Sequence, residues 1–272
     1  MLESKRIGFI GGGAMGEALI RGMLQAKLVN ASQITINDVV QERLDYLAAS
    51  LGVSTSLDSQ EVAGNVDVLF LTIKPQTIND VLDNIAPVVD KKTTVISIVA
   101  GITIATLQGR LPGVPIVRVM PNTAVAVGAG MSAIALGKYA SAQAGELASA
   151  VFASVGRVVT VNEDAMDAVT GLSGSGPAFV YLLIDALADA GVRVGFSRPM
   201  ALTLAAQTLY GAAKMVLETG EHPAKLRDMV TSPGGTSIAG IHVLEQKGVR
   251  AALIDAVVAA TNRSREMGQK MK

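Results

Sequence analysis

A glycine motif near the start of the chain has the spacing of a site for a dinucleotide pyrophosphate. Gly11, Gly13 and Gly16 form a G-x-G-x-x-G directly after the apolar run Ile7–Ile10. In such a turn the first glycine permits a tight bend, the second lets the backbone approach the pyrophosphate, and the third packs a helix on a strand. The helix start adds unpaired N–H groups. A glycine-rich turn without a ligand is the alternative, but the position of the motif in a β-α-β pattern favours dinucleotide binding.

The end of the next apolar run bears on the choice between NAD and NADP. An acidic side chain there pairs with the ribose 2′-hydroxyl, whereas a nearby arginine receives a 2′-phosphate. The chain reads Ile36-Asn37-Asp38-Val39-Val40, and the first arginine after it is Arg43. NAD is favoured if Asp38 faces the ribose. Either nucleotide fits if Asn37 takes that place and Asp38 is a solvated turn residue. The residues alone leave both alternatives open.

Polar residues also follow three later apolar runs, at the edge where ligands bind in open α/β sheets. Lys74 follows Leu71–Ile73, Ser97–Gly101 ends the next run, and Asn122 follows Val119–Pro121. A charge at Lys74 and an amide at Asn122 could orient a ribose or a nicotinamide. Taken singly, most of these residues read as ordinary loop residues, whereas together they outline a cleft.

Two glycine-rich turns in the second half combine hydroxyl groups with a helix start. The first, Gly171–Ala178, is explained equally well by close packing of chain on chain and by ligand contact. The second, Thr231–Ser237, contains Pro-Gly-Gly. Its successive N–H groups at Gly234, Gly235 and Thr236 form a concavity suited to a carboxylate. Hydroxyls that can reach a ring nitrogen beside it belong to Thr231, Ser232, Thr236 and Ser237.

Composition excludes several classes of protein. Lys and Arg total 23, as do Asp and Glu, so the chain has no net charge to attract nucleic acid. Without cysteine or a G-x-S-x-G turn, nucleophilic catalysis is not indicated. His222 and His242 have no carboxylates at metal-binding spacing, so no metal is expected. No apolar run reaches the length of a membrane span and no targeting segment opens the chain, so we expect a cytoplasmic protein without a membrane partner.

The elements that position these residues follow from the pattern of apolar residues. Short β-branched runs alternate with amphipathic stretches through the first part, as in a parallel sheet covered by helices. The expected strands are Arg6–Ile10, Ile34–Asn37, Val66–Ile73, Thr94–Ile98, Ile116–Val119, Met131–Ala135 and Val158–Val161. The expected helices are Met15–Ala26, Gln41–Leu51, Gln76–Ile85, Ile104–Arg110 and Ala142–Ser154.

Beyond Val161 the pattern changes to helices alone. Pro177 stands at the start of the first helix and Gly191 at its end. Ser197 caps the second helix, which Gly220 closes. Two more are expected at Ser237–Gln246 and Val249–Met267. The sequence therefore predicts an α/β fold: a Rossmann-type, doubly wound, dinucleotide-binding domain over residues 1–162 and an all-α domain over residues 163–272.

With these residues assembled, the chain resembles pyrroline-5-carboxylate reductase along its whole length. Besides the glycine motif, the matching blocks are Leu71–Gln76, Met120–Thr123, Asp167–Ala178, Asp185–Gly191 and Leu226–Leu244, with SPGGTSIAGIHVLE at Ser232–Glu245. Many families share the glycine motif, but the last blocks are specific. The resemblance implies reduction of 1-pyrroline-5-carboxylate to L-proline by NAD(P)H, usually NADPH. It also implies a helical domain that interlocks with a partner, an active site completed across a homodimer, and frequent assembly into decamers.

The resemblance also implies roles for individual residues. Those that would line the cofactor are Gly11, Gly12, Gly13, Ala14, Met15, Gly16, Asn37, Asp38, Ser59, Thr72, Ile73, Lys74, Pro75, Ile98, Val99, Ala100 and Asn122. Those that would line the substrate are Glu163, Ser232, Pro233, Gly234, Gly235, Thr236 and Ser237. The family often has Thr where this chain has Ser237, and Asn where it has Ser59. The second departure leaves the adenine-side contacts open.

Hydride transfer to an imine needs no strong side-chain base, in agreement with the absence of candidates. The protein has to bring the two reacting carbons to about 3–3.5 Å, exclude water and hold the carboxylate. We expect Ser237 to be the catalytic residue, because its hydroxyl can bond the ring nitrogen while solvent supplies the proton. Both nucleotides are expected to work, with NADPH modestly preferred.

Two rival functions are less well supported by the residues. A β-hydroxyacid dehydrogenase needs a lysine on the helix after the domain boundary, yet Leu182–Ala190 has none and the next is Lys214. A regulatory relative without turnover is expected to have lost the glycines or the Ser232–Ser237 turn, and both are present. Tyr181–Ile184 is apolar throughout, on a helix that a single small domain leaves wet, which predicts an obligate dimer built from residues 162–272.

Overall fold

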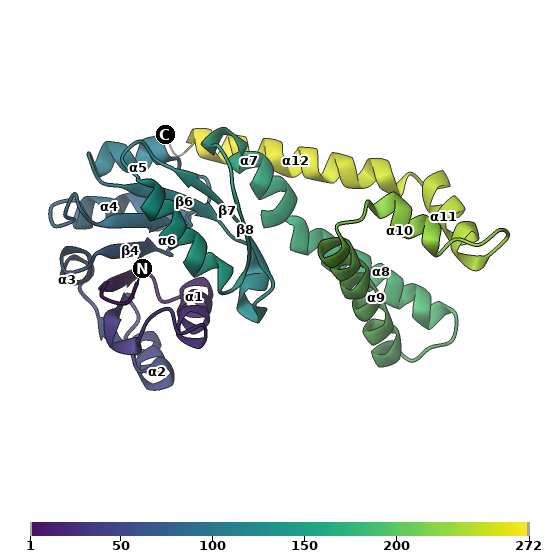
Figure 1. The fold of residues 1–272 in the computed structure, drawn as a ribbon, viewed down its shortest axis with the longest axis horizontal. Coiled ribbons are helices and arrows are strands. Elements are labelled where there is room, and N and C mark those ends of the chain that lie inside the picture. Colours follow the sequence, from purple (N-terminus) through teal and green to yellow (C-terminus); the bar gives the residue numbers. More distant parts are fainter. Residues whose placement is uncertain (1, 271–272) are drawn as a thin grey trace. The chain divides into compact units, whose positions relative to one another are not determined.

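The first part of the chain folds around one eight-stranded sheet in a computed structural model that describes residues 2–270 (Figure 1). The strand order is β3-β2-β1-β4-β5-β6-β7-β8. Pairing is parallel from β3 to β6, β7 is antiparallel to β6, and β8 is parallel to β7. The strands are β1 (Ile7–Ile10), β2 (Ile34–Asn37), β3 (Ser54–Ser56), β4 (Val68–Leu71), β5 (Thr94–Ser97), β6 (Ile116–Met120), β7 (Gly130–Leu136) and β8 (Gly156–Thr160). The predicted Rossmann-type sheet is confirmed.

Helices cover both faces of this sheet and divide its core in two. They are α1 (Ala14–Gln25), α2 (Gln41–Leu51), α3 (Ser59–Gly64), α4 (Ile78–Ile85), α5 (Ile104–Arg110) and α6 (Ala142–Ala153). One core contains side chains of α1, α2 and α6, and the other contains side chains of α3, α4 and α5. β1 and β4 are buried along their whole length, and the rings of Phe9 and Phe70 stack at 4.5 Å between them. Strands covered on both faces have to be apolar throughout, as these are.

The five helices predicted for this part are present, but one strand and one helix were not predicted. β3 reads Ser-Thr-Ser, which has neither alternation nor bulk, and α3 is only six residues long. Asp58 caps α3 by accepting the N–H groups of Gln60 and Glu61 at 2.8 and 3.3 Å. This cap is the local signal from which the helix could have been predicted.

The chain forms two compact units, which are described separately. Unit 1 comprises residues 1–175 together with 259–272, and unit 2 comprises residues 176–258. The change of sequence pattern near Asn162 marks the end of the last strand. The boundary between the two compact units lies further along the chain, after residue 175, because the short helix α7 (Met166–Val169) still packs its Met166 into the core of unit 1.

Unit 2 is entirely helical. Its helices are α8 (Gly176–Arg193), α9 (Arg198–Thr219), α10 (Pro223–Met229), α11 (Thr236–Gln246) and the first part of α12 (Val249–Lys270). Gly191 does not end α8 as predicted, because it packs against Ala201 of α9 and the helix continues to Arg193. Gly220 does close α9, with φ of 67°. α10 was not predicted, although His222 caps it and Pro223 starts it.

The predicted glycine-rich turn at Gly171–Ala178 is instead helical. Residues Thr170–Gly174 form a π-helix that leads into α8, and the N–H of Ser175 donates to the carbonyl of Thr170 at 2.8 Å. A β-carbon on Gly174 would lie 2.9 Å from Cε of Met120, the mobile end of that side chain, so glycine gives a close but adjustable contact here. The wide turn absorbs an extra residue without breaking the helix.

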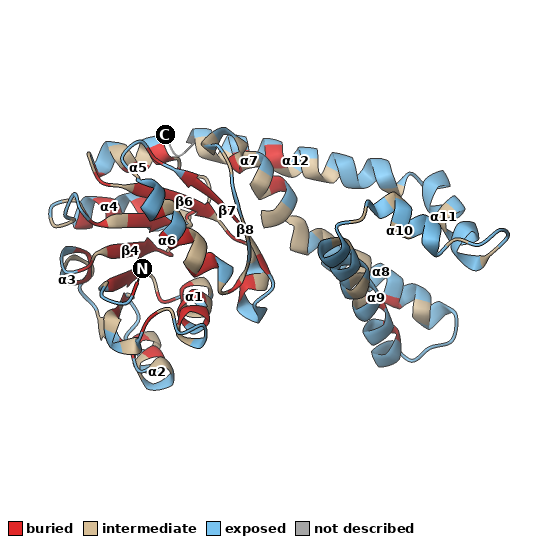
Figure 2. Cartoon of the chain, viewed as in Figure 1, coloured by how far each residue is buried: buried red, intermediate tan, exposed pale blue. Residues whose placement is uncertain are grey.

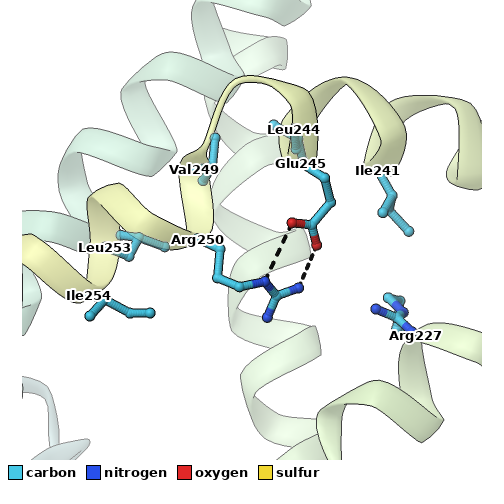
Figure 3. A pocket seen from close by; sticks show the side chains of 8 residues that line it. All are labelled: Arg227, Ile241, Leu244, Glu245, Val249, Arg250, Leu253 and Ile254. Carbon is cyan, nitrogen blue, oxygen red and sulfur yellow. Dashed lines mark hydrogen bonds and ion pairs between the residues drawn. The ribbon is translucent and has the colours of Figure 1, made fainter.

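The helices of unit 2 are largely exposed, as their pale-blue colour in Figure 2 shows, and many of the exposed residues are apolar. Tyr181 and Leu182 are 62% and 70% exposed. A groove of about 530 Å³ lies between α10, α11 and α12, with an ion pair between Glu245 and Arg250 on its wall (Figure 3). By length and composition alone, Glu163–Arg193 and Arg198–Thr219 are apolar enough to cross a membrane, contrary to the prediction that no stretch reaches that length.

Candidate functional site

The glycine loop between β1 and α1 has the geometry that its sequence predicts. Gly11 has φ of 101°, and a β-carbon on it would lie 2.8 Å from the carbonyl oxygen of Thr72. A β-carbon on Gly16 would lie 2.7 Å from the carbonyl oxygen of Gly11. Gly13 has no atom within 4 Å of where its β-carbon would be. It is also the N-cap of α1, and no side chain caps the helix. The first N–H groups of α1 are therefore open to a phosphate.

Two side chains fix this loop from neighbouring strands. The hydroxyl of Thr72, after β4, donates to the carbonyl oxygens of Gly11 at 2.6 Å and Ile10 at 3.1 Å. Asp38, after β2, accepts the N–H of Gly12 at 2.8 Å and that of Val40 at 3.1 Å. Asp38 therefore joins the glycine loop to the turn after β2, and these contacts do not show whether its carboxylate also faces the ribose.

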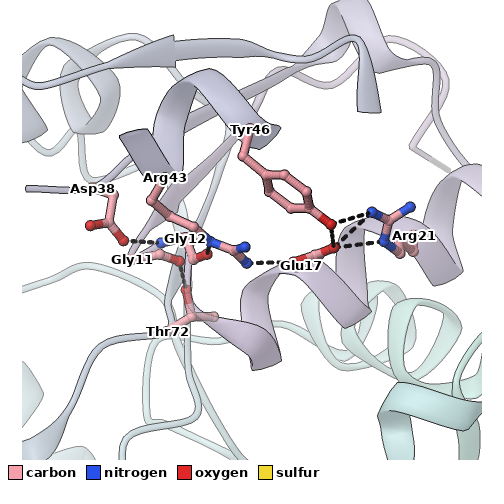
Figure 4. A network of polar contacts seen from close by, with 8 residues as sticks. All are labelled: Gly11, Gly12, Glu17, Arg21, Asp38, Arg43, Tyr46 and Thr72. Carbon is pink, nitrogen blue, oxygen red and sulfur yellow. Dashed lines mark hydrogen bonds and ion pairs between the residues drawn. The ribbon is translucent and has the colours of Figure 1, made fainter. Parts of the chain in front are cut away.

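Arg43, which is not adjacent to Asp38 in the sequence, also contacts the glycine loop. Arg43, in the first turn of α2, donates from Nε to the carbonyl oxygen of Gly12 at 2.6 Å and pairs with Glu17 of α1 at 2.5 Å (Figure 4). Arg21 and Tyr46 bond the same carboxylate of Glu17. Burial acts to raise the pKa of Glu17, but the hydrogen bonds and charges of Arg21 and Arg43 outweigh it, so this pKa lies below its ordinary value.

A cavity of about 560 Å³ opens beside the ends of β2 and β3. Its lining includes Asn37, Val39, Leu57, Asp58, Ser59, Asp80, Val81 and Asn84. The amide of Asn37 donates to the carbonyl oxygen of Ser56 at 3.1 Å, and that of Asn84 donates to the hydroxyl of Ser59 at 2.7 Å. Val39 is 88% exposed. A polar rim beside exposed apolar side chains suits an adenosine group, and the lining carries acids but no base.

The Pro-Gly-Gly turn of unit 2 precedes α11 as predicted, with one difference. Gly234 has φ of 65°, and the N–H of Gly235 donates to the carbonyl oxygen of Ser232 at 3.0 Å. The prediction that the N–H of Gly235 points to a carboxylate is therefore wrong, because the turn itself uses it. Gly235 is the N-cap of α11 and no side chain caps the helix. The N–H groups of Thr236 and Ser237 consequently lack intrahelical partners.

Comparison with known proteins agrees with this combination of a glycine loop and a Pro-Gly-Gly turn. A family model described as pyrroline-5-carboxylate reductase dimerisation matches residues 163–267, and one described as NADP oxidoreductase, coenzyme F420-dependent, matches residues 6–101. The pyrroline-5-carboxylate reductase of Methanosarcina acetivorans is 48% identical over 99% of this chain and 100% of that protein. The chain belongs to the pyrroline-5-carboxylate reductase family.

Solved structures of the family have the same fold. The pyrroline-5-carboxylate reductase of Coxiella burnetii is 34% identical and superposes with a TM-score of 0.92 over 97% of this chain and 99% of that one. The pyrroline carboxylate reductase of Plasmodium falciparum, solved with NADP bound, is 31% identical with a TM-score of 0.87 over 98% and 99%. The dimerisation model spans both apolar helices, so the family accounts for them by contact with a second subunit.

The other residues predicted to line the cofactor lie along the strand ends of unit 1. Thr72, Ile73, Lys74 and Pro75 follow β4, and Ile98, Val99 and Ala100 follow β5. The amide oxygen of Asn122, after β6, accepts the N–H groups of Ala124 and Met131, both at 3.2 Å. Its nitrogen donates to the carbonyl oxygen of Ser173 at 3.0 Å. Asn122 therefore joins the strand end to the π-helix.

Glu163 belongs to unit 1, whereas the Pro-Gly-Gly turn belongs to unit 2. One oxygen of its carboxylate accepts the N–H of Ile104 at 2.6 Å and a guanidinium N–H of Arg118 at 3.0 Å. These contacts stabilise the start of α5 and pair a buried arginine. Arg118 is 45 residues distant in sequence, so no local pattern signals this pairing. Residues 2–270 contain no group of three or more metal-binding side chains.

Proposed function

We propose that this chain reduces the C=N bond of 1-pyrroline-5-carboxylate to L-proline with NADPH or NADH. Membership of the pyrroline-5-carboxylate reductase family supports this reaction. The observation that carries it is the Pro-Gly-Gly turn at the start of α11, which no side chain caps, together with the uncapped start of α1 after the G-x-G-x-x-G loop. The first offers N–H groups to a carboxylate and the second to a pyrophosphate.

The residues of unit 1 fit a dinucleotide. The space above Gly13 and the uncapped start of α1 would hold the pyrophosphate, and the cavity lined by Asn37 and Ser59 would hold the adenosine. Thr72 and Asp38 hold the loop in place. The strand ends at Ile98–Ala100 would lie along the nicotinamide half. Bound there, NAD(P)H supplies the hydride that becomes the new C–H bond at C5 of the ring.

The residues of the turn hold and polarise the substrate. The N–H groups of Thr236 and Ser237 point from the helix start, where a carboxylate is stabilised by the helix dipole. The Ser237 hydroxyl, in the same turn, bonds the ring nitrogen. As the C–H bond forms at C5, the π electrons of the C=N bond move to this nitrogen, which is best prepared as a protonated iminium. Solvent supplies the proton, so no side-chain acid is required.

A homodimer built by the helices of residues 163–267 supports this chemistry, and further assembly into a decamer is part of the proposal. The family model for dimerisation covers that range. The turn residues Ser232–Thr236 are mostly exposed in one chain, as is expected of a site that a second subunit completes.

The proposed activity is tested by following oxidation of NADPH and NADH at 340 nm, a wavelength set by the nicotinamide. The substrates are 1-pyrroline-5-carboxylate and, as controls, a panel of keto acids and β-hydroxy acids, the latter with the oxidised cofactors. We expect rapid turnover with the imine alone and L-proline as its product. Equal or greater turnover with a keto acid or a β-hydroxy acid contradicts the proposal.

A further inference from the structure

A second polar cavity lies in unit 1, and none of its lining residues is one to which the reaction assigns a role, although its Arg118 pairs with Glu163. It measures about 260 Å³ and is lined by Gly101, Thr103, Arg118, Asp167, Arg265 and Gln269, among others. These residues come from the segment after β5, from β6, from α7 and from the end of α12, which belongs to unit 1 (Figure 1). This volume is smaller than the roughly 300–1,000 Å³ of sites for drug-sized ligands, and suits a molecule the size of an amino acid.

One residue that lines this cavity, Arg118, is a buried cation, which is unusual beside a simple gap in packing. It lies on a central strand, and this charged residue is only 6% exposed. Glu163 accepts one of its N–H groups at 3.0 Å, but that carboxylate oxygen is shared with the N–H of Ile104. A guanidinium has several further N–H donors, and a buried cation with spare donors favours a carboxylate beside it.

The walls carry a second cation and one anion. Arg265 of α12 is exposed and donates to the side chain of Asn262 at 3.2 Å. One carboxylate oxygen of Asp167 accepts the hydroxyl of Ser264 at 2.6 Å, which leaves its other oxygen for a donor. Arg118 keeps N–H donors beyond its bond to Glu163, so the lining offers two guanidinium groups and one carboxylate, which are complementary to a zwitterion whose two charges are separated by a single carbon.

We propose that this cavity is a second ligand site, which binds a small α-amino acid. The α-carboxylate lies between Arg118 and Arg265, and the ammonium group bonds Asp167. A dinucleotide is too large for the cavity, and a simple anion has no donor for the carboxylate oxygen of Asp167 that Ser264 does not use. The site does not depend on the proposed reduction. L-Proline is the probe used, because it is a small α-amino acid; only this choice of probe rests on the proposed function, of which L-proline is the product.

The test is equilibrium dialysis of the full-length protein with radiolabelled L-proline. Arg265→Gln removes one cation from an exposed position and is expected to lower the amount bound at saturation by one molecule per chain. Arg263→Gln is the matched control, because Arg263 lies on the same helix and pairs with Glu266 at 2.8 Å without lining the cavity. The control is expected to bind as the unaltered protein does. Equal binding by the two variants overturns the proposal.

The charge assignment is tested with two analogues and one further variant. Pyrrolidine lacks the carboxylate, and tetrahydrofuran-2-carboxylate lacks the amine. Each is expected to bind this site at least roughly tenfold more weakly than L-proline. Asp167→Asn keeps an acceptor for Ser264. It is expected to weaken the binding of L-proline but not that of tetrahydrofuran-2-carboxylate, which has no amine to bond Asp167. Inorganic phosphate that displaces L-proline fully at equal concentration contradicts a zwitterion site. Turnover of 1-pyrroline-5-carboxylate is measured in parallel, so failure of the reaction and failure of this site are read separately.

Discussion

At the scale of single residues, charge near the ribose end of the cofactor site bears on the choice of nucleotide. Asp38 faces the glycine loop, and Asp58 and Asp80 line the adjoining cavity. Arg43 reaches the same loop, but its charge is paired with Glu17. A 2′-phosphate entering this region meets more negative than positive charge. The resemblance to the family favours NADPH, whereas these contacts favour NADH, so both nucleotides are expected to serve.

We predict that Asp38→Asn raises the ratio of kcat/KM for NADPH to that for NADH by roughly three- to tenfold, because one charge at about 4 Å is worth about 1 kcal/mol in a water-like medium. Asparagine keeps an acceptor for the N–H of Gly12. The control is Asp45→Asn, which neutralises an exposed acid on the same helix as Arg43 and is expected to leave the ratio unchanged. The same ratio in the Asp38 variant and the parent means that the carboxylate does not meet the 2′ position.

We predict that Ser237→Ala lowers kcat/KM for 1-pyrroline-5-carboxylate by roughly ten- to a thousand-fold, the range for loss of a transition-state hydrogen bond. Thermal stability is expected to persist, because Gly235 and not Ser237 is the N-cap of α11. Ser237→Thr restores the hydroxyl and most of the rate. Ser141→Ala gives the opposite pattern, since Ser141 caps α6 at 3.2 Å: about 1 kcal/mol less stability, with turnover unchanged. An active Ser237→Ala enzyme contradicts the assignment.

At the scale of elements, Glu17 joins α1 to α2 through Arg43 and Tyr46, directly beneath the glycine loop. Its lowered pKa means that this contribution to stability is complete above its unfolded-state pKa of 4.5 and is lost as the pH falls through its lower folded value. Glu17→Gln is expected to lower Tm at pH 7 by about 2–4 °C, for about 1 kcal/mol.

The difference in Tm between this variant and the parent is expected to shrink as the pH falls below 4.5. Thermal unfolding followed by circular dichroism from pH 7 to pH 3.5 measures it. Glu146→Gln, at an exposed position of α6, is the control and is expected to change Tm little at any of these pH values. A difference that stays constant down to pH 3.5 shows that the charge of Glu17 is not what joins the two helices.

Elements of this chain were predictable where a local pattern specifies them. β1 and β4 are continuous apolar runs, and α9 ends at Gly220 as predicted. Ser197 stands at the N-cap of α9, but its side chain does not make the predicted capping bond. The π-helix at Thr170–Gly174 was not predictable, because the glycines in this segment are typical of a turn. At the site, the glycine loop and the Pro-Gly-Gly turn follow from sequence. The return of Arg43 to Gly12 does not, because it depends on how α2 packs.

At the scale of the whole molecule, the exposed apolar surface of unit 2 requires a partner. The two long apolar helical segments are Glu163–Arg193 and Arg198–Thr219. Only 11% of the most apolar stretch of each is buried in one chain. Large apolar surfaces of this kind are typical of obligate homodimers, whose interfaces resemble a core cut in half. The dimerisation model for the family spans the same helices.

We predict that Leu182→Arg disrupts the dimer, because Leu182 is 70% exposed in one chain and an arginine there would place an unpaired charge in an apolar interface. Leu182→Ala removes bulk without adding charge and is the control. Sedimentation equilibrium at micromolar concentration is expected to give a dimer or larger assembly for the parent and the Ala variant, and monomer for the Arg variant. Turnover of 1-pyrroline-5-carboxylate is expected to fall with the dimer, because the proposed function has each site completed by the second subunit. A monomeric Arg variant that keeps full activity would place the whole site within one chain.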